Sequence, residues 1–419
     1  MLLRFAPMIY GPTALYSFGQ GVILPLLPII AVQLGASLPV AALVPAGIVV
    51  GQLCGNIPAG WLVAKVGERA TMIIASSGSI VAACAMAFAR VWWMLALGAF
   101  AVGIFAAAFA LARHSFMTTR VPYAYRSRAL AMLGGSFRLG AFTGPFVAAG
   151  LLAVFGSERS TIWFFAGVLV LVGLLVALGP DPEKRLGVPR PAPRAPSRED
   201  AASTEDTGEP VTGSITVPER IGVWRTMWQY RAVLARLGAA GASLAAVRAA
   251  RQSVLPLWGV SIGLESQTIA LVVGIAGALD FALFYVSGQV TDRFGRLWAV
   301  VPASILMGSS LLLLSLTHEL DSAALWFGVF AIVLGVGNGL SSGILLTIGA
   351  DVAPREEPAA FLGSWRTITD AGGSSTPLII SGVTAIASLS FATAIVGVIG
   401  LLGTLAFLRW VPKYAPGPR

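Results

Sequence analysis

Charged residues are scarce in this chain of 419 residues: Asp, Glu, Lys and Arg together make up 11%, whereas 56% of the residues are hydrophobic. A soluble domain carries roughly a quarter charged residues, so the composition excludes a set of soluble domains. The two cysteines, Cys54 and Cys84, lie in apolar segments and indicate neither a metal cluster nor a redox compartment. The sequence also lacks an H-E-x-x-H motif and a Walker loop. It therefore predicts no enzyme, no cofactor and no metal site.

Long apolar runs dominate the rest of the sequence, and each is long enough to cross a bilayer, which takes about 20 residues. They predict an all-α membrane protein with twelve transmembrane helices in two six-helix bundles. We expect the first bundle in residues 1–179 and the second in residues 229–419. The predicted spans are 10–33, 39–63, 70–89, 92–119, 129–154, 161–179, 233–262, 267–290, 298–317, 323–350, 359–383 and 387–410.

Residues 180–228 differ in composition from both bundles. They contain the proline-rich run Pro189–Pro196 and the acidic run Glu199–Glu209, which cannot bury a core, so we expect a largely flexible linker. Only Arg90 and Arg159 fall in loops on the side of the membrane opposite to this linker. The positive-inside rule then places the linker and both termini in the cytoplasm. Only three of the 28 basic residues are lysine, which is typical of a GC-rich bacterial coding sequence, so we expect a bacterial inner membrane. The net charge of +9 reflects this bias and does not indicate nucleic-acid binding.

The two bundles repeat one another in sequence. At an offset of 228 residues, Gly60 aligns with Gly288 and Gly67 with Gly295, and at an offset of 232 Gly140 aligns with Gly372. Two similar halves joined by a linker are typical of secondary transporters, whose substrate binds between the halves near the midplane of the membrane. Without an ATP site, such a transporter takes its energy from an ion gradient or from the substrate's own gradient.

The segment Gly288–Arg296 (GQVTDRFGR) resembles the signature loop of the major facilitator superfamily, G-x-x-x-D-R-x-G-R. Its first-half copy keeps the glycines but has Ala64 where the family usually has aspartate. The resemblance implies a latch that holds one side of the transporter closed, with a charged connector as the alternative. The residues that it implicates are Gly60, Gly67, Arg69, Arg126, Arg128, Gly288, Asp292, Arg293, Gly295 and Arg296.

In the fifth predicted span, Gly140, Gly144 and Pro145 resemble the G-x-x-x-G-P motif of the family's antiporters, especially the twelve-helix drug:proton exporters. The fourth-span arginine of those exporters has no counterpart, because Gly98 stands at the aligned position. Close packing of the fifth span is the alternative reading of the same residues.

Ionisable residues inside spans are expensive to bury in lipid and therefore mark functional positions. Asp280 is the first candidate for proton coupling because it lies mid-span with no basic residue within one turn. Asp370 comes second because Arg366, one turn away, can pair with it, and His114 is third. The candidates for substrate binding are Gln20, Gln52, Arg113, Arg138, Arg251, Gln252, Trp258, Asp280, Phe284, Asn338 and Arg366.

Arginine outnumbers aspartate within the predicted spans, so the interior favours an anionic or zwitterionic amphiphile over a cation. We therefore expect a monomeric, proton-coupled exporter of a small amphipathic compound or drug, with protons, substrate and the lipid bilayer as its partners. A metabolite uptake symporter is the alternative within transport. A non-coupled lipid-handling or sensor protein with the same fold is the alternative outside it.

Overall fold

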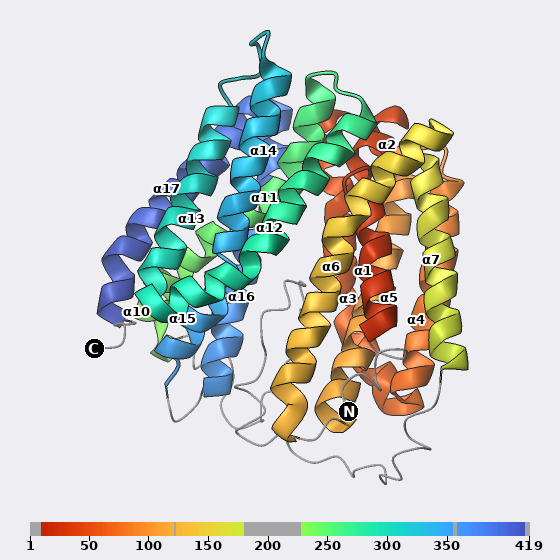
Figure 1. The fold of residues 1–419 in the computed structure, drawn as a ribbon, viewed down its shortest axis with the longest axis horizontal. Helices are drawn as coiled ribbons and strands as arrows, with labels where there is room; N and C mark the ends of the chain where they lie inside the picture. Colours follow the sequence, from red (N-terminus) through yellow and green to blue (C-terminus); the bar gives the residue numbers. More distant parts are fainter. Residues whose placement is uncertain (1–9, 121–122, 180–227, 355–357, 415–419) are drawn as a thin grey trace.

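The computed structural model describes residues 10–120, 123–179, 228–354 and 358–414, and within these ranges it contains helices and no strand. Figure 1 shows the helices in two groups, the first half (red to yellow) on the right and the second half (green to blue) on the left. Their bounds are α1 (Gly11–Ile23), α2 (Leu27–Gln33), α3 (Leu38–Val66), α4 (Glu68–Ala87), α5 (Trp92–Arg120), α6 (Tyr123–Phe155), α7 (Arg159–Leu178), α10 (Arg231–Val233), the π-helix η4 (Leu234–Gly238), α11 (Ala239–Ser261), α12 (Ser266–Phe294), α13 (Arg296–Leu314), α14 (Ala323–Leu340), α15 (Ile344–Val352), α16 (Pro358–Ile386) and α17 (Leu389–Tyr414).

The sequence repeat reappears as a repeat of helix packing. In the first half α1 packs on α6, α3 on α5 and α4 on α7; in the second half α11 packs on α16, α12 on α14 and α13 on α17. Each pair joins the same two spans of its half. The fold class predicted from the sequence is therefore confirmed. The proposed linker, 180–228, lies almost wholly outside the described residues.

Eleven helical segments of the described chain are long and apolar enough to cross a membrane. The predicted span 359–383 forms α16, which has 29 residues but does not meet this apolarity criterion. The reason lies in its sequence, because Arg366 and Asp370 are followed by the polar run Gly372–Thr376. α16 is long enough to span, but its composition suits a position inside the protein rather than in lipid.

Two of the predicted spans are interrupted. The first breaks into α1 and α2 around Pro25, which lacks the backbone N–H that a continuous helix needs. The tenth breaks into α14 and α15 at Ser341–Gly343, where Gly343 has a φ of +75°. Only glycine adopts this left-handed conformation at little cost, so the break follows from the local sequence.

The glycine motif of α6 lies where α6 crosses α1. A Cβ atom on Gly144 would lie 2.6 Å from the Cα atom of Gly21, and one on Gly21 would lie 2.8 Å from the carbonyl oxygen of Ala141. One turn away, Gly140 of α6 packs on the Ala14 carbonyl of α1, and its repeat partner Gly372 of α16 packs in the same way on the Ala242 carbonyl of α11. Small residues let the two backbones approach closely, so the packing reading of the motif holds at both positions.

The two halves touch through α6 with α12 and through α3 with α16. We call the end of the bundle where α1 begins and α17 finishes the terminal end (lower in Figure 1) and the other the opposite end. At the opposite end, the Ser266 hydroxyl donates a hydrogen bond to the Glu158 carboxylate over 2.8 Å. Nearer the middle, the Phe142 and Phe281 rings stack with centroids 4.9 Å apart.

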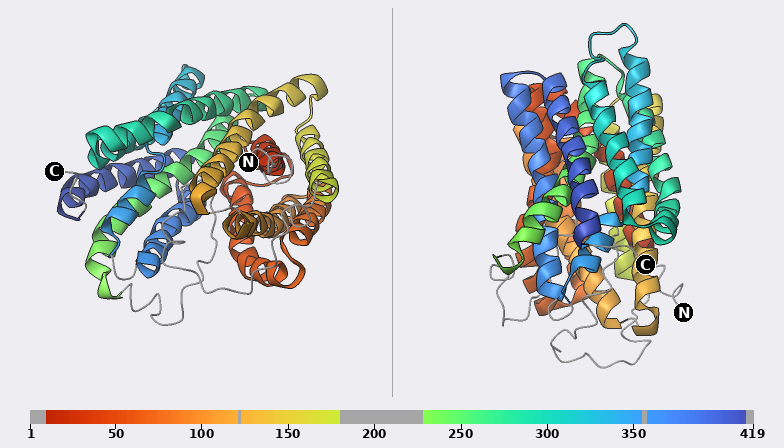
Figure 2. Two further views of the ribbon diagram at one scale, coloured as in Figure 1. Left: turned by 60° about the horizontal axis from the view of Figure 1, so that its bottom comes forward. Right: turned by 90° about the vertical axis from the view of Figure 1, so that its left-hand side faces the viewer.

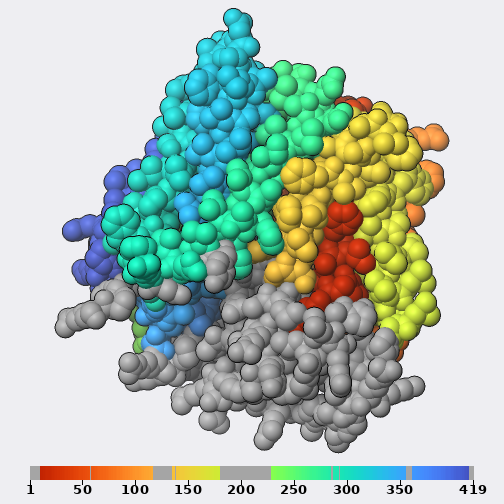
Figure 3. Space-filling view, viewed as in Figure 1, coloured from red at the N-terminus to blue at the C-terminus, as the bar shows by residue number. Residues whose placement is uncertain are grey.

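Toward the terminal end the ribbons of α6 and α12 diverge, as both Figure 1 and the left view of Figure 2 show. The space-filling view shows α6 and α12 in contact in its upper part (Figure 3). The contact between α6 and α12 therefore lies toward the opposite end of the bundle.

Candidate functional site

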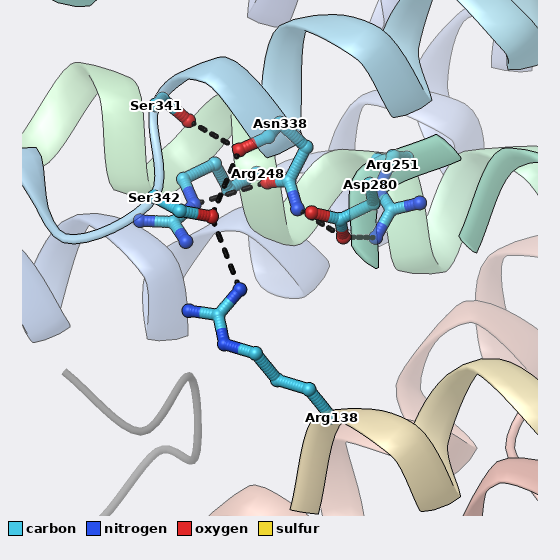
Figure 4. Close-up of polar contacts among 7 residues, drawn as sticks. All are labelled: Arg138, Arg248, Arg251, Asp280, Asn338, Ser341 and Ser342. Carbon is cyan, nitrogen blue, oxygen red and sulfur yellow. Dashed lines mark hydrogen bonds and ion pairs between the residues drawn. The ribbon is translucent and has the colours of Figure 1, made fainter. Parts of the chain in front are cut away.

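Seven polar side chains meet near the middle of the bundle, where α6 of the first half approaches the second half (Figure 4). Six belong to α11, α12, α14 and the break after α14, and one reaches across from α6. We call them the polar cluster: Arg138, Arg248, Arg251, Asp280, Asn338, Ser341 and Ser342.

Asp280 is the acidic centre of the polar cluster. Its Oδ2 atom accepts hydrogen bonds from Nη2 of Arg251 at 3.2 Å and from Nδ2 of Asn338 at 2.6 Å. The ion pair with Arg251 is mostly buried, with exposed side-chain fractions of 12% for Arg251 and 16% for Asp280. The other carboxylate oxygen, Oδ1, is buried and has no hydrogen-bond partner among the described atoms. Half of the carboxylate is therefore still available to a proton or a ligand.

Asn338 connects this ion pair to a second arginine. Its side-chain oxygen accepts a hydrogen bond from Nε of Arg248 at 3.0 Å, while its amide nitrogen donates to Asp280. These two contacts fix the orientation of the amide group, because only one assignment of oxygen and nitrogen satisfies both. Asn338 thereby holds Arg248 and Asp280 in one network.

The break in the tenth span supplies the next members of the cluster. The Ser341 hydroxyl turns back to the Asn338 carbonyl over 2.9 Å, and Ser287 of α12 donates to the Leu340 carbonyl over 2.7 Å. The Ser287 hydroxyl also lies 3.0 Å from the Ser342 carbonyl oxygen. Carbonyls that the break frees from the helix thus find partners, which a lipid environment requires.

Arg138 is the member that comes from the first half. Its Nη1 atom donates to the Ser342 hydroxyl over 3.0 Å, and its guanidinium lies over the Phe284 ring, 4.2 Å from the centroid. Both partners belong to the second half. Any movement that separates the halves at this depth must break these contacts.

A second group of predicted residues lies on α16 and α5. Arg366 and Asp370 form the expected pair, with Nε of Arg366 3.5 Å from Oδ2 of Asp370, and they are more exposed than the first pair. Arg366 is also close enough to His114 of α5 for its charge to act on the imidazole. Arg113, beside His114, is 3% exposed. Arg366 and His114 thus lie close to one another across the two halves.

The remaining candidates for substrate binding lie in different surroundings. Gln20 is buried in α1, Gln52 of α3 has a buried Oε1 atom without a described partner, and Gln252 is exposed on α11. Trp258 is fully buried and packs edge-on against His318, with ring centroids 5.2 Å apart. The structure thus places Phe284 beside the polar cluster but puts Trp258 in a packed position toward the opposite end.

The loop residues of the signature motif lie at the terminal end. Gly67 and Gly295 adopt nearly equal backbone angles, with φ values of +86° and +92°, as the repeat predicts. Arg69 donates to the last carbonyls of α7, and Arg296 forms an ion pair with Asp351 of α15 at 2.6 Å. Gly60, Gly288 and Arg293 are exposed. The side chains of Arg126, Arg128 and Asp292 lie outside the described residues, so the latch remains a prediction.

Three members of the polar cluster are not among the candidates predicted from the sequence: Arg248, Ser341 and Ser342. The two serines fall inside the predicted span 323–350, which the structure shows to be broken. The signal was present in the run Asn338–Gly343 (NGLSSG), since serine and glycine after a polar residue favour a break. Among the described residues, no group of three His, Cys, Asp or Glu side chains is placed to hold a metal ion.

Comparison with known proteins gives one family and one fold. The sequence matches the family model of the Major Facilitator Superfamily over residues 13–377. The fold is similar to a POT family transporter in complex with 5-aminolevulinic acid (TM-score 0.74, 12% identity, covering 97% of this chain and 95% of that chain) and to a D-xylose-proton symporter (0.67, 12%, covering 97% of each). No curated protein matches this chain in sequence.

Proposed function

Because the chain belongs to the Major Facilitator Superfamily, and is thus a multi-pass membrane transporter rather than an enzyme, we propose that it couples protons to the movement of a small anionic or zwitterionic compound. The observation that carries this proposal is the Arg251–Asp280 ion pair within the polar cluster. Charged residues at this depth are costly to keep unless they act on a substrate or an ion.

The charge of the polar cluster supports an anionic group on the substrate. The polar cluster contains three arginines, Arg138, Arg248 and Arg251, and one carboxylate, Asp280, which pairs with Arg251. The local field is therefore positive and attracts anions. A guanidinium also matches a carboxylate with two parallel hydrogen bonds, so a compound with a carboxylate suits the site.

The ion pair also provides a route to proton coupling. A substrate carboxylate that binds Arg251 displaces Asp280, and the displaced carboxylate then takes up a proton because its positive partner is gone. Proton and anion consequently bind together rather than in turn. This geometry favours the uptake symporter, with substrate and proton moving in the same direction.

Proton-coupled export is the second candidate, and a separate observation favours it. Gly140, Gly144 and Pro145 resemble the antiporter motif, and the two glycines lie at the close crossing of α1 and α6. In that mechanism, binding of the proton and binding of the substrate exclude one another. Asp280, Asp370 and His114 remain the candidate proton carriers in either direction.

The sign of the proton flux separates these candidates. The purified protein is reconstituted into vesicles that contain a pH-sensitive dye, and amino acids, short peptides and small carboxylic acids are added outside one at a time. Under co-transport, an accepted compound acidifies the interior; under antiport, the interior becomes alkaline. Asp280→Asn should abolish either signal, whereas Asp370→Asn should keep it. Binding without any proton flux would overturn the coupling and favour the sensor or lipid-handling alternative.

We further propose that the protein acts as a monomer in a bacterial inner membrane with its terminal end in the cytoplasm, as the distribution of basic residues indicates. In a variant without Cys54 and Cys84, a new cysteine in the segment 190–210 should react with a membrane-impermeant reagent only from inside. One at Glu319 should react only from outside. The reverse pattern would invert the orientation.

A further inference from the structure

The terminal end of the second half carries a group of basic and aromatic side chains that lies apart from the polar cluster. Three cations surround the ring of Trp410: the charged groups of Arg236, Arg409 and Lys413 lie 4.7, 5.6 and 5.7 Å from its centroid. Arg236 also donates a hydrogen bond to the Tyr414 hydroxyl over 2.8 Å. We call these five residues the basic–aromatic cluster.

Three like charges around one ring repel one another, and an aromatic face offsets this only partly. Within the described residues, none of the three forms an ion pair with a carboxylate. Arg236, Arg409 and Lys413 are all exposed. The cluster is therefore short of negative charge, and its aromatic partners hold the cations in place for an anion from outside the protein.

The surface next to the cluster is apolar. On α17, Leu402 and Leu405 expose 59% and 62% of their surface, and the spacing Leu402, Leu405, Arg409 and Lys413 places all four on one face of the helix. This face thus runs from exposed leucines to exposed cations as it approaches the terminal end. An amphiphile with an anionic head and an apolar tail matches that sequence of side chains.

We propose that the basic–aromatic cluster binds an acidic phospholipid. The phosphodiester lies among Arg236, Arg409 and Lys413, and an acyl chain lies along Leu402 and Leu405. Basic residues close to a membrane surface attract anionic lipids, and the arginines add directed hydrogen bonds to phosphate oxygens. Tyr414 positions Arg236 for this contact.

The first half offers a matched control. Lys65 lies 4.7 Å from the centroid of the Trp61 ring, and Trp61 is 62% exposed. This is one cation on one ring at the same end of the bundle, as expected of a simple anchor at the membrane interface. A general attraction of lipids to this end would involve Lys65 as much as Arg409, whereas a specific site would not.

The test measures binding of fluorescent phosphatidylglycerol to the full-length protein in neutral detergent micelles. We expect saturable binding that weakens about fivefold for each cation replaced, in Arg236→Gln, Arg409→Gln and Lys413→Gln. Lys65→Gln should bind as tightly as wild type, and Arg409→Lys should keep most of the affinity because it keeps the charge. Elution of each variant as a single monodisperse peak in gel filtration checks that it is folded.

Other results would overturn the proposal. Equal affinity for phosphatidylcholine would mean that the anionic head group does not contribute to binding. An equal loss of affinity for phosphatidylglycerol in Lys65→Gln would mean that general surface charge, and not a specific site, attracts the lipid. Displacement of the lipid by inorganic phosphate at a matching concentration would show that the site takes a free anion and not a lipid. Unchanged affinity in all three single variants would place the lipid elsewhere.

Discussion

The fourth and tenth spans occupy the same place in their halves but differ in continuity. α5 runs unbroken from Trp92 to Arg120, whereas the tenth span breaks between α14 and α15. Their packing is equivalent up to the break: Gly103 of α5 packs on the Ile48 carbonyl of α3, and Gly335 of α14 packs on the Ala276 carbonyl of α12. Ile48 and Ala276 are themselves 228 residues apart. The two halves thus share a packing scheme and diverge just beyond it.

The divergence follows from a few residues. Where the second half has Ser341, Ser342 and Gly343, the first has Phe109, Ala110 and Leu111 by the glycine alignment. Alanine and leucine continue a helix, whereas serine hydroxyls and glycine favour its interruption. The broken span places polar groups beside Asp280, whose counterpart in the first half is the uncharged Gln52. The two halves therefore share their helix packing, but six of the seven residues of the polar cluster belong to the second half.

The largest expected effect comes from removing the charge of Asp280. Asp280→Asn leaves Arg251 without its carboxylate, so the free energy of unfolding should fall by roughly 2 kcal/mol, and uphill transport should fall to background. Gln52→Leu, at the matching position of the first half, should keep transport. The measurements are thermal unfolding in detergent and transport by reconstituted vesicles.

A double-mutant cycle sharpens this result. Arg251→Gln combined with Asp280→Asn should recover much of the stability that either change loses, because no unpaired charge remains. The double variant should still fail to drive uphill transport. If Gln52→Leu were as damaging to transport as Asp280→Asn, the chemistry would be shared equally by the halves.

The sequence was sufficient to predict the helices and their close packing but not the contacts within the polar cluster. Long apolar runs determine the helices, and the glycine repeat indicates the close packing at Gly140 and Gly372, since both depend on residues close in sequence or in the repeat. The i,i+4 pair Arg366–Asp370 was predicted for the same reason. The pairing of Arg251 with Asp280, and the reach of Arg138 to Ser342, depend on how helices from distant segments are rotated. No local spacing encodes that rotation.

The glycine crossings test the shared packing. Gly140→Ala and Gly372→Ala insert a Cβ into the backbone of the neighbouring helix, and each should lower the free energy of unfolding by about 1–3 kcal/mol. Gly150 and Gly382, on the same two helices, have open space beside them. Alanine there should stabilise by about 0.5–1 kcal/mol through helix propensity. Thermal unfolding of the four variants checks this, and a loss confined to one half would contradict equivalent crossings.

Two glycines at and before the break in the tenth span should respond to alanine with smaller changes in the free energy of unfolding, opposite in sign. Gly343→Ala forces a side chain into the left-handed region and should destabilise the protein by about 1–2 kcal/mol. Gly328→Ala, inside α14 with nothing within 4 Å of the new Cβ, should stabilise by about 0.5–1 kcal/mol. The measurement compares the thermal unfolding midpoints of Gly343→Ala and Gly328→Ala with that of the unchanged protein. Equal shifts of the same sign would mean that α14 and α15 form one continuous helix in solution.

The smallest effect concerns the loops at the terminal end, where the halves use opposite charges. Arg296, at the start of α13, pairs with Asp351, while Glu68, at the start of α4, accepts a hydrogen bond from the Ser115 hydroxyl over 3.3 Å. The side chains of Arg296 and Asp351 are 20% and 31% exposed, so their coupling should be about 0.5 kcal/mol at low salt. At 1 M salt, where the screening length is about 3 Å, a double-mutant cycle of Arg296→Gln and Asp351→Asn should give almost none. Reversing the pair, with Arg296→Asp and Asp351→Arg together, should keep the coupling.

The matching residue of the first half, Glu68, serves as the control. Glu68→Gln should leave stability nearly unchanged, because the amide oxygen still accepts a hydrogen bond from Ser115. Coupling between Arg296 and Asp351 that persists in high salt would mean that the pair is held by packing rather than by charge, and the contrast between the two loops would then disappear.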